Sequence, residues 1–125
     1  MRLPAVSAYL LVLRTVTSAL AARMNFPIDE MEDLRIAVDE ACVMLISPAL
    51  PGADMEVEFA LAGDALEVAV NVPTVTGSLP AKDTFSWMVL CALADGVRSQ
   101  LGPDNRVTIN LRKRRVVGYP QGEAP

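Results

Sequence analysis

The stretch MEVEFALAGDALEVAVNV, residues 55–72, decides the fold. Its apolar residues occupy every second position on both sides of a Gly63-Asp64 turn. A two-residue period is typical of a half-buried strand, and two such strands around a tight turn form a hairpin. The sequence therefore predicts a β-hairpin whose apolar side contains Met55, Val57, Phe59, Leu61, Leu66, Val68, Val70 and Val72.

Helical periods flank this hairpin. Apolar residues recur at three- and four-residue intervals over 7–24, 29–46 and 84–100, which predicts three amphipathic helices. Asp29 and Glu32 have the spacing of a capping box and are expected to open the second helix. A last alternation over 106–111 predicts a further strand. In the third helix the residues expected to face inward are Phe85, Met88, Val89, Ala92, Leu93 and Val97.

These elements predict an α+β two-layer sandwich, in which a mostly antiparallel mixed sheet carries three helices on one face. Residues 1–116 are expected to form one domain, and 117–125 a flexible tail. A chain of 125 residues, 52% of them hydrophobic, has the means to build its own core.

The composition excludes several kinds of chemistry. The chain has no histidine, so a Ser-His-Asp or Cys-His nucleophile and a histidine-ligated zinc are ruled out within it. Its formal net charge of −4 argues against a general nucleic-acid binder. Cys42 and Cys91 lack metal or disulfide spacing, and we expect them to be buried thiols in the cytoplasm.

Two segments allow alternative interpretations. Residues 5–21 resemble a short signal peptide, but Arg14 interrupts the apolar run, which favours an amphipathic helix that the mature protein keeps. The apolar run is also too short to span a bilayer. The basic run Arg112 to Arg115 follows the last strand, where a solvated cluster is favoured over a contact to phosphate or another anionic partner.

The stretch DLRIAVDEAC, residues 33–42, resembles the N-box helix of the anti-sigma factor serine kinases. The likeness extends along almost the whole chain, through the break RMNFP at 23–27, the hairpin, and the segments FSW at 85–87 and ALADGV at 92–97. It implies the histidine-kinase-like ATPase fold, also called the Bergerat or GHKL fold. In this family a glutamate polarises the serine that is phosphorylated, and an asparagine four residues later holds magnesium against ATP.

Several residues depart from the family's nucleotide motifs. Glu40 matches the glutamate, but Met44 stands at the magnesium position, and a thioether is a poor ligand for this hard cation. Val72 stands in the place of the aspartate that binds adenine, and Thr84 and Ser86 stand where glycines open the third helix to phosphate. We therefore expect no bound cofactor, a pocket filled by side chains and no kinase activity. Glu40 is then an ordinary helix carboxylate.

Met44 and Trp87 are expected to fill the core of the collapsed pocket. A tryptophan at position 87 could instead stack on an adenine-like ligand, and this alternative stays open. If Mg-ATP is bound after all, the alternative is an active serine kinase that works through Glu40.

The resemblance also implies protein partners. A sigma factor and a STAS-type anti-anti-sigma protein are expected to bind, with contacts from the first-helix arginine, which matches Arg14. An ordinary solvated arginine is an equally weighted interpretation of that residue. Of the family's first strand, which helps to build a homodimer, only Met1-Arg2-Leu3 is present, so dimerisation is altered or the natural start lies upstream. No direct contact with nucleic acid or membrane is expected. A scaffold subunit without a sigma factor is a further alternative.

Overall fold

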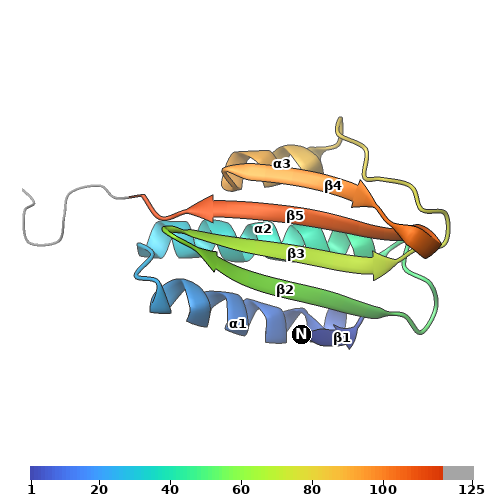
Figure 1. The fold of residues 1–125 in the computed structure, drawn as a ribbon, viewed down its shortest axis with the longest axis horizontal. Coiled ribbons are helices and arrows are strands. Elements are labelled where there is room, and N and C mark those ends of the chain that lie inside the picture. Colours follow the sequence, from blue (N-terminus) through green and yellow to red (C-terminus); the bar gives the residue numbers. More distant parts are fainter. Residues whose placement is uncertain (117–125) are drawn as a thin grey trace, which may run out of the picture.

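The computed structural model describes residues 1–116, and Figure 1 shows helices packed against one face of a curved sheet. The sheet order is β1-β2-β3-β5-β4, and every neighbouring pair is antiparallel. The predicted α+β two-layer fold is therefore confirmed, and no parallel pair occurs among the strands of 1–116. The expected tail lies outside the described residues. The elements are β1 (Arg2–Pro4), a 3-10 turn (Ser7–Tyr9), α1 (Leu10–Arg23), α2 (Ile28–Ile46), β2 (Asp54–Ala62), β3 (Ala65–Pro73), α3 (Phe85–Leu93), β4 (Gly96–Leu101), a second 3-10 turn (Pro103–Asn105) and β5 (Arg106–Arg114).

One hydrophobic core lies between the helices and the sheet. The helices α1, α2 and α3 contribute side chains to it, and so do inward positions of β2, β3 and β5, as the hairpin periodicity predicts except at Leu61, which is 58% exposed near the end of β2. Among its fully buried members are Leu13, Leu34, Leu45, Val57, Val68, Val70, Leu90 and Ile109. Within residues 1–116, no helix combines the length and apolar content needed to cross a membrane.

The helix predicted over 84–100 is wrong beyond Leu93. The chain leaves the helix at Ala94, and residues 96–101 form β4, which pairs with β5. Gly96 favours this break because glycine is a poor helix former, and the next residues alternate as a strand does. The shorter helix also turns a different side to the core: Trp87 and Leu90 are buried, whereas Phe85 is 79% and Met88 59% exposed.

Three smaller expectations are also corrected. The second helix begins at Ile28 after Pro27, with no side-chain cap, so Asp29 lies inside the first turn, where its charge favours the helix N-terminus. The first helix is a 3-10 turn over Ser7–Tyr9 before it becomes α-helical. Cys42 is buried as expected, but Cys91 is exposed because it points away from the core side of α3.

Candidate functional site

Arg14 and Asp39 join α1 to α2 through a two-point ion pair. Arg14 Nε donates to Asp39 Oδ1 over 2.9 Å, and Nη2 donates to Oδ2 over 2.8 Å. Hydrogen bonding to Asp39, together with the attraction between the two charges, raises the pKa of Arg14 above its ordinary value. The side chains are 38% and 27% exposed, so the pair lies at the surface of the helix layer.

Asp39 is a polar partner that the sequence reasoning missed. It stands beside the motif glutamate, Glu40, but only the packing of α1 against α2 places it opposite Arg14. Glu40 itself is half-buried: Ile36 and Val43, one turn away in each direction, are exposed, whereas Met44, one turn further along α2, packs against the core. The structure therefore places Arg14 and Glu40 on neighbouring helices, α1 and α2, with both side chains partly exposed.

Apolar side chains occupy the positions at which the resemblance predicts nucleotide motifs, together with the neighbouring Trp87. Met44 packs against the core, Val72 at the end of β3 is fully buried, and Trp87 on α3 is 6% exposed. Lys82 Nζ lies 5.9 Å from the centroid of the Trp87 ring, within the range of a cation–π contact. These side chains offer methyl groups, a thioether and an indole ring to the interior.

The start of α3 is closed by a side chain. Thr84 is the N-cap residue: its Oγ1 accepts a hydrogen bond from Trp87 N over 3.2 Å and donates to the carbonyl of Ala81 over 3.1 Å. A helix N-terminus offers unpaired N–H groups to an anion, and a capping hydroxyl uses one of them. Ser86, the other predicted position, is half-buried on the first turn of the helix.

A hydrogen-bond network fixes the chain between β3 and α3. Buried Thr74 donates through Oγ1 to the Asn105 carbonyl over 2.7 Å and accepts from Gly77 N over 2.9 Å. Gly77 has a φ of 68°, and a Cβ there would lie 2.6 Å from Asn105 Oδ1, so the loop approaches Asn105 too closely for a side chain. The sequence reasoning missed this network, because Thr74 and Asn105 are brought together only by the pairing of β3 with β5.

The basic run at 112–115 is paired within the chain. Its first three residues belong to β5, so the run does not follow the strand as expected. The hydrogen bond from Arg114 holds the pKa of Asp64 below its ordinary value. The cluster thus ties the end of β5 to the hairpin and the helix layer. The contacts are Arg112 Nε to Glu67 Oε2 (3.6 Å), Lys113 Nζ to Asp33 Oδ2 (3.8 Å), Arg114 Nη2 to Asp64 Oδ2 (3.2 Å) and Arg115 Nη1 to the Met24 carbonyl (2.6 Å).

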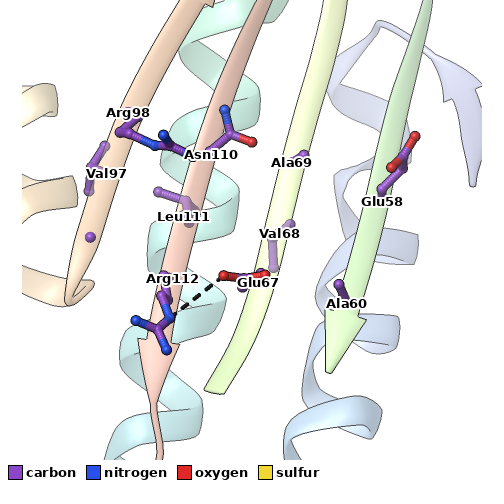
Figure 2. Close-up of a pocket in the computed structure, with 11 residues that line it drawn as sticks. Glu58, Ala60, Glu67, Val68, Ala69, Val97, Arg98, Asn110, Leu111 and Arg112 are labelled. Carbon is purple, nitrogen blue, oxygen red and sulfur yellow. Dashed lines mark ion pairs between the residues drawn. The ribbon is translucent and has the colours of Figure 1, made fainter. Parts of the chain in front are cut away.

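A groove of about 430 Å³ lies on the helix-free face of the sheet. Figure 2 shows Glu58 at one side, Arg98 at the other, and the Arg112–Glu67 ion pair between them. Opposite charges on neighbouring strands stabilise a sheet, which accounts for this pair without a ligand. Arg112 of the basic run lines the groove, whereas Arg14, Glu40, Met44, Val72, Thr84 and Ser86 do not. Among residues 1–116, no three side chains of the His, Cys, Asp or Glu type are grouped as a metal site would need.

Two curated proteins are similar to this chain over much of its length. The chain is 38% identical over 90 residues to the anti-sigma-F factor RsbW of Mycobacterium tuberculosis, an alignment that covers 72% of this chain and 54% of that protein. It is 37% identical over 73 residues to the serine-protein kinase RsbW of Bacillus subtilis, covering 56% of this chain and 46% of the relative. The chain thus spans about half the length of the curated relatives it matches. No family model matches it.

The fold is shared with a crystal structure of the RsbU and RsbW domains of a Mycobacterium tuberculosis protein. The TM-score is 0.71 at 17% identity, over 91% of this chain and 32% of that one. The fold is therefore the GHKL, or histidine-kinase-like ATPase, fold. Over the region that aligns with the RsbW relatives, the chain belongs to the family of anti-sigma factor serine kinases.

Proposed function

We propose that this chain is an anti-sigma factor of a partner switch. It binds a sigma factor in the cytoplasm, a STAS-type anti-anti-sigma protein releases it, and neither step uses ATP. The observation that carries the proposal is a contrast around the helix layer: Arg14 on α1 and Asp39 on α2 form a partly exposed ion pair, whereas Met44, Val72 and Trp87, at the positions of the family's nucleotide motifs or beside them, pack into the core. The M. tuberculosis relative is itself named an anti-sigma factor.

The residues present do not fit Mg-ATP. The buried side chain of Val72 has no oxygen to accept the adenine amino group, and the thioether of Met44 packs on the core, where magnesium would need oxygen ligands. Thr84 uses a helix N–H group that a phosphate would otherwise engage. Hydrogen bonds among residues 74–77, Pro48 and Asn105 also hold the first part of the connection that follows β3.

The test is the isolation of partners from the native host, followed by binding measurements with purified proteins. We expect a sigma factor to copurify and to bind the purified chain without nucleotide, and calorimetry with millimolar Mg-ATP to give no heat of binding. Tight Mg-ATP binding, or transfer of phosphate to a STAS protein, would overturn the nucleotide-free part of the proposal. Copurification of other proteins without a sigma factor would favour a scaffold subunit.

An active serine kinase is the second candidate. Two observations favour it: the motif glutamate is present as the half-buried Glu40 on α2, and the Bacillus relatives are named serine-protein kinases. The substitution Glu40→Ala separates the two functions. It abolishes phosphate transfer if the chain is a kinase that depends on this base, and it leaves sigma-factor affinity unchanged if the chain acts by binding alone.

A further inference from the structure

The strand β4 forms one edge of the sheet. Within residues 1–116, β5 is the one strand that pairs with it, and β1 lies at the opposite edge (Figure 1). The outer side of an edge strand presents a row of backbone N–H and C=O groups to which another extended chain can add. A further strand can therefore join the sheet at β4 without any change in the five strands already present.

The hydrogen bonds to β5 show which backbone groups of β4 point outward. Gly102 N donates to the Arg106 carbonyl over 2.8 Å, and these two residues continue the register that pairs Gln100 with Thr108. In an antiparallel pair, residues that bond to the neighbouring strand alternate with residues whose N–H and C=O groups point the other way. The even-numbered residues of β4 therefore bond to β5. The residues that present their backbone groups to the outer edge are Val97, Ser99 and Leu101.

These outward positions are complementary to a second copy of themselves. An antiparallel pair of β4 strands with its two-fold axis at Ser99 places Ser99 opposite Ser99, and Val97 opposite Leu101 of the other copy. Every hydrogen-bonded pair then joins two residues whose backbone groups point outward. Val97 packs toward the core and Leu101 is 54% exposed, so the pairing also joins two apolar side chains on the helix side of the sheet.

The other face of β4 favours the same register. Arg98 borders the groove on the helix-free face (Figure 2), and Gln100 lies on that face as well because it is two positions away. With the axis at Ser99, each Arg98 stands opposite Gln100 of the other copy, whose amide oxygen can accept from the guanidinium. An axis at position 98 would place the two guanidinium groups opposite each other, and an axis at position 100 would leave Val97 without a partner inside β4.

Exposed apolar side chains accompany this edge on the neighbouring helix. The helix α3 packs beside β4 (Figure 1), and its residues Phe85 and Met88 are exposed. They lie three positions apart, on the side of α3 away from buried Trp87 and Leu90. Pairing of two β4 strands places both α3 helices on the same face of one continuous sheet, so apolar side chains exposed on one copy can pack against the other.

We propose that this chain forms a two-fold dimer in which β4 pairs antiparallel with β4 of a second copy, centred on Ser99. This interface lies at the opposite edge of the sheet from β1, the strand through which the family resemblance implies a dimer. The inference does not depend on the proposed function, because neither a sigma factor nor a nucleotide takes part in the pairing.

The first test places charges on the two-fold axis. Ser99 faces the same residue of the other copy, so Ser99→Lys and Ser99→Glu each oppose like charges, and each should weaken dimerisation at least about tenfold. An equimolar mixture of the two variants should form a dimer, because lysine then faces glutamate. Sedimentation equilibrium at low ionic strength, where the charges are least screened, measures the dissociation constants. The wild type should sediment at twice the monomer mass at submillimolar concentration.

Ala60→Lys is the matched control. Ala60 is exposed on β2 and lines the groove on the helix-free face, so this variant adds the same charge to the sheet away from the β4 edge. We expect its dissociation constant to equal that of the wild type, and circular dichroism to show that all three variants keep the fold. A dimer weakened by Ala60→Lys but not by the Ser99 variants would overturn the proposal, because the helix-free faces would then form the interface.

Amide hydrogen exchange of the wild type tests the register without a substitution. The amides of Arg98 and Gln100 bond to β5 and should be protected at every protein concentration. Those of Val97, Ser99 and Leu101 should exchange rapidly in the dilute monomer and at least about tenfold more slowly once the dimer forms. A wild type that stays monomeric at submillimolar concentration, or a dimer in which these three amides exchange as fast as in the monomer, would contradict the proposal. So would folded Ser99→Lys and Ser99→Glu variants that fail to dimerise when mixed.

Discussion

The two sides of α2 differ in whether their side chains are accessible to a binding partner. Toward α1, an ion pair between Arg14 and Asp39 stands at the surface among exposed apolar residues. Toward α3 and β3, the residues at the nucleotide positions are packed against the core. One helix thus carries an open polar surface and a closed apolar one. Substitutions on the closed side should therefore change the free energy of unfolding, and those on the open side should change the affinity for a partner.

The largest expected effect is a difference in thiol reactivity between buried Cys42 and exposed Cys91. Burial, with a smaller contribution from the charge of Asp39, raises the pKa of Cys42 from 9.0 to about 12. A rise of about three units lowers the thiolate fraction about a thousandfold near neutral pH, and the thiolate is the reactive form. Exposed Cys91 should thus be alkylated in the native chain, and Cys42 only after unfolding. Mass spectrometry of the alkylated protein measures this, and equal labelling of both thiols would mean that the inner side of α2 is open.

An aspartate in place of Val72, as the family's adenine-binding motif has, should destabilise the folded chain. Val72→Asp places a carboxyl at a fully buried position, and we expect a loss of about 3–5 kcal/mol in the free energy of unfolding. Burial raises the pKa of the introduced carboxyl, so the loss is largest at neutral pH and shrinks as pH falls and the group is protonated. Urea unfolding at several pH values measures both effects.

The matched control for this variant is Asn71→Asp, one residue earlier on β3. Asn71 faces the other side of the sheet and accepts a hydrogen bond from Arg106 over 2.7 Å, so a carboxylate there keeps a cationic partner. It should change stability by less than about 1 kcal/mol. A Val72→Asp variant that stays stable and gains Mg-ATP binding would show that the nucleotide positions are not closed.

Loss of the α3 cap should have an intermediate effect. Thr84→Ala removes the hydroxyl that accepts from Trp87 N, and we expect a loss of about 1 kcal/mol. Thr15→Ala is the control, because that hydroxyl is exposed and bonds back to the Leu11 carbonyl inside α1. Thermal unfolding followed by circular dichroism compares them. Equal effects of the two substitutions would remove the capping role assigned to Thr84.

The smallest stability effect is expected on the open side. Asp39→Asn breaks the charge pair with Arg14, but exposed ion pairs contribute little to folding because water screens them. Its unfolding midpoint should differ from that of the wild type by no more than that of Glu67→Gln, the variant that removes the exposed ion pair with Arg112. A loss of stability as large as that of Val72→Asp would mean that the pair serves the fold rather than the surface.

The sequence was sufficient for elements with a clear period. The hairpin and the last strand alternate strictly, and 28–46 has a sustained helical period, so these elements were predicted within a few residues. Residues 94–101 were missed because Ala94, Val97 and Leu101 continue the three- and four-residue spacing of the helix before them, although Gly96 interrupts it. The pairing of β4 with β5 decided the outcome, and such long-range pairing is not visible in a local pattern.

The candidate site was predictable only in part. Glu40, Met44, Val72, Thr84 and Ser86 could be found from motif spacing, because they lie within continuous segments. Asp39 and Thr74 could not, since their partners Arg14 and Asn105 are 25 and 31 residues away and meet them only in the folded chain. The partners of Arg112 to Arg115 were missed for the same reason.

The most direct test of the account is the affinity of the chain for its sigma factor with and without Mg-ATP. Calorimetry on the two purified proteins would measure this in matched buffers, with magnesium alone as the control. Because the nucleotide positions are occupied by core side chains, we predict the same dissociation constant in both conditions. An affinity that changes tenfold or more on addition of Mg-ATP, beyond the effect of magnesium alone, would contradict the account.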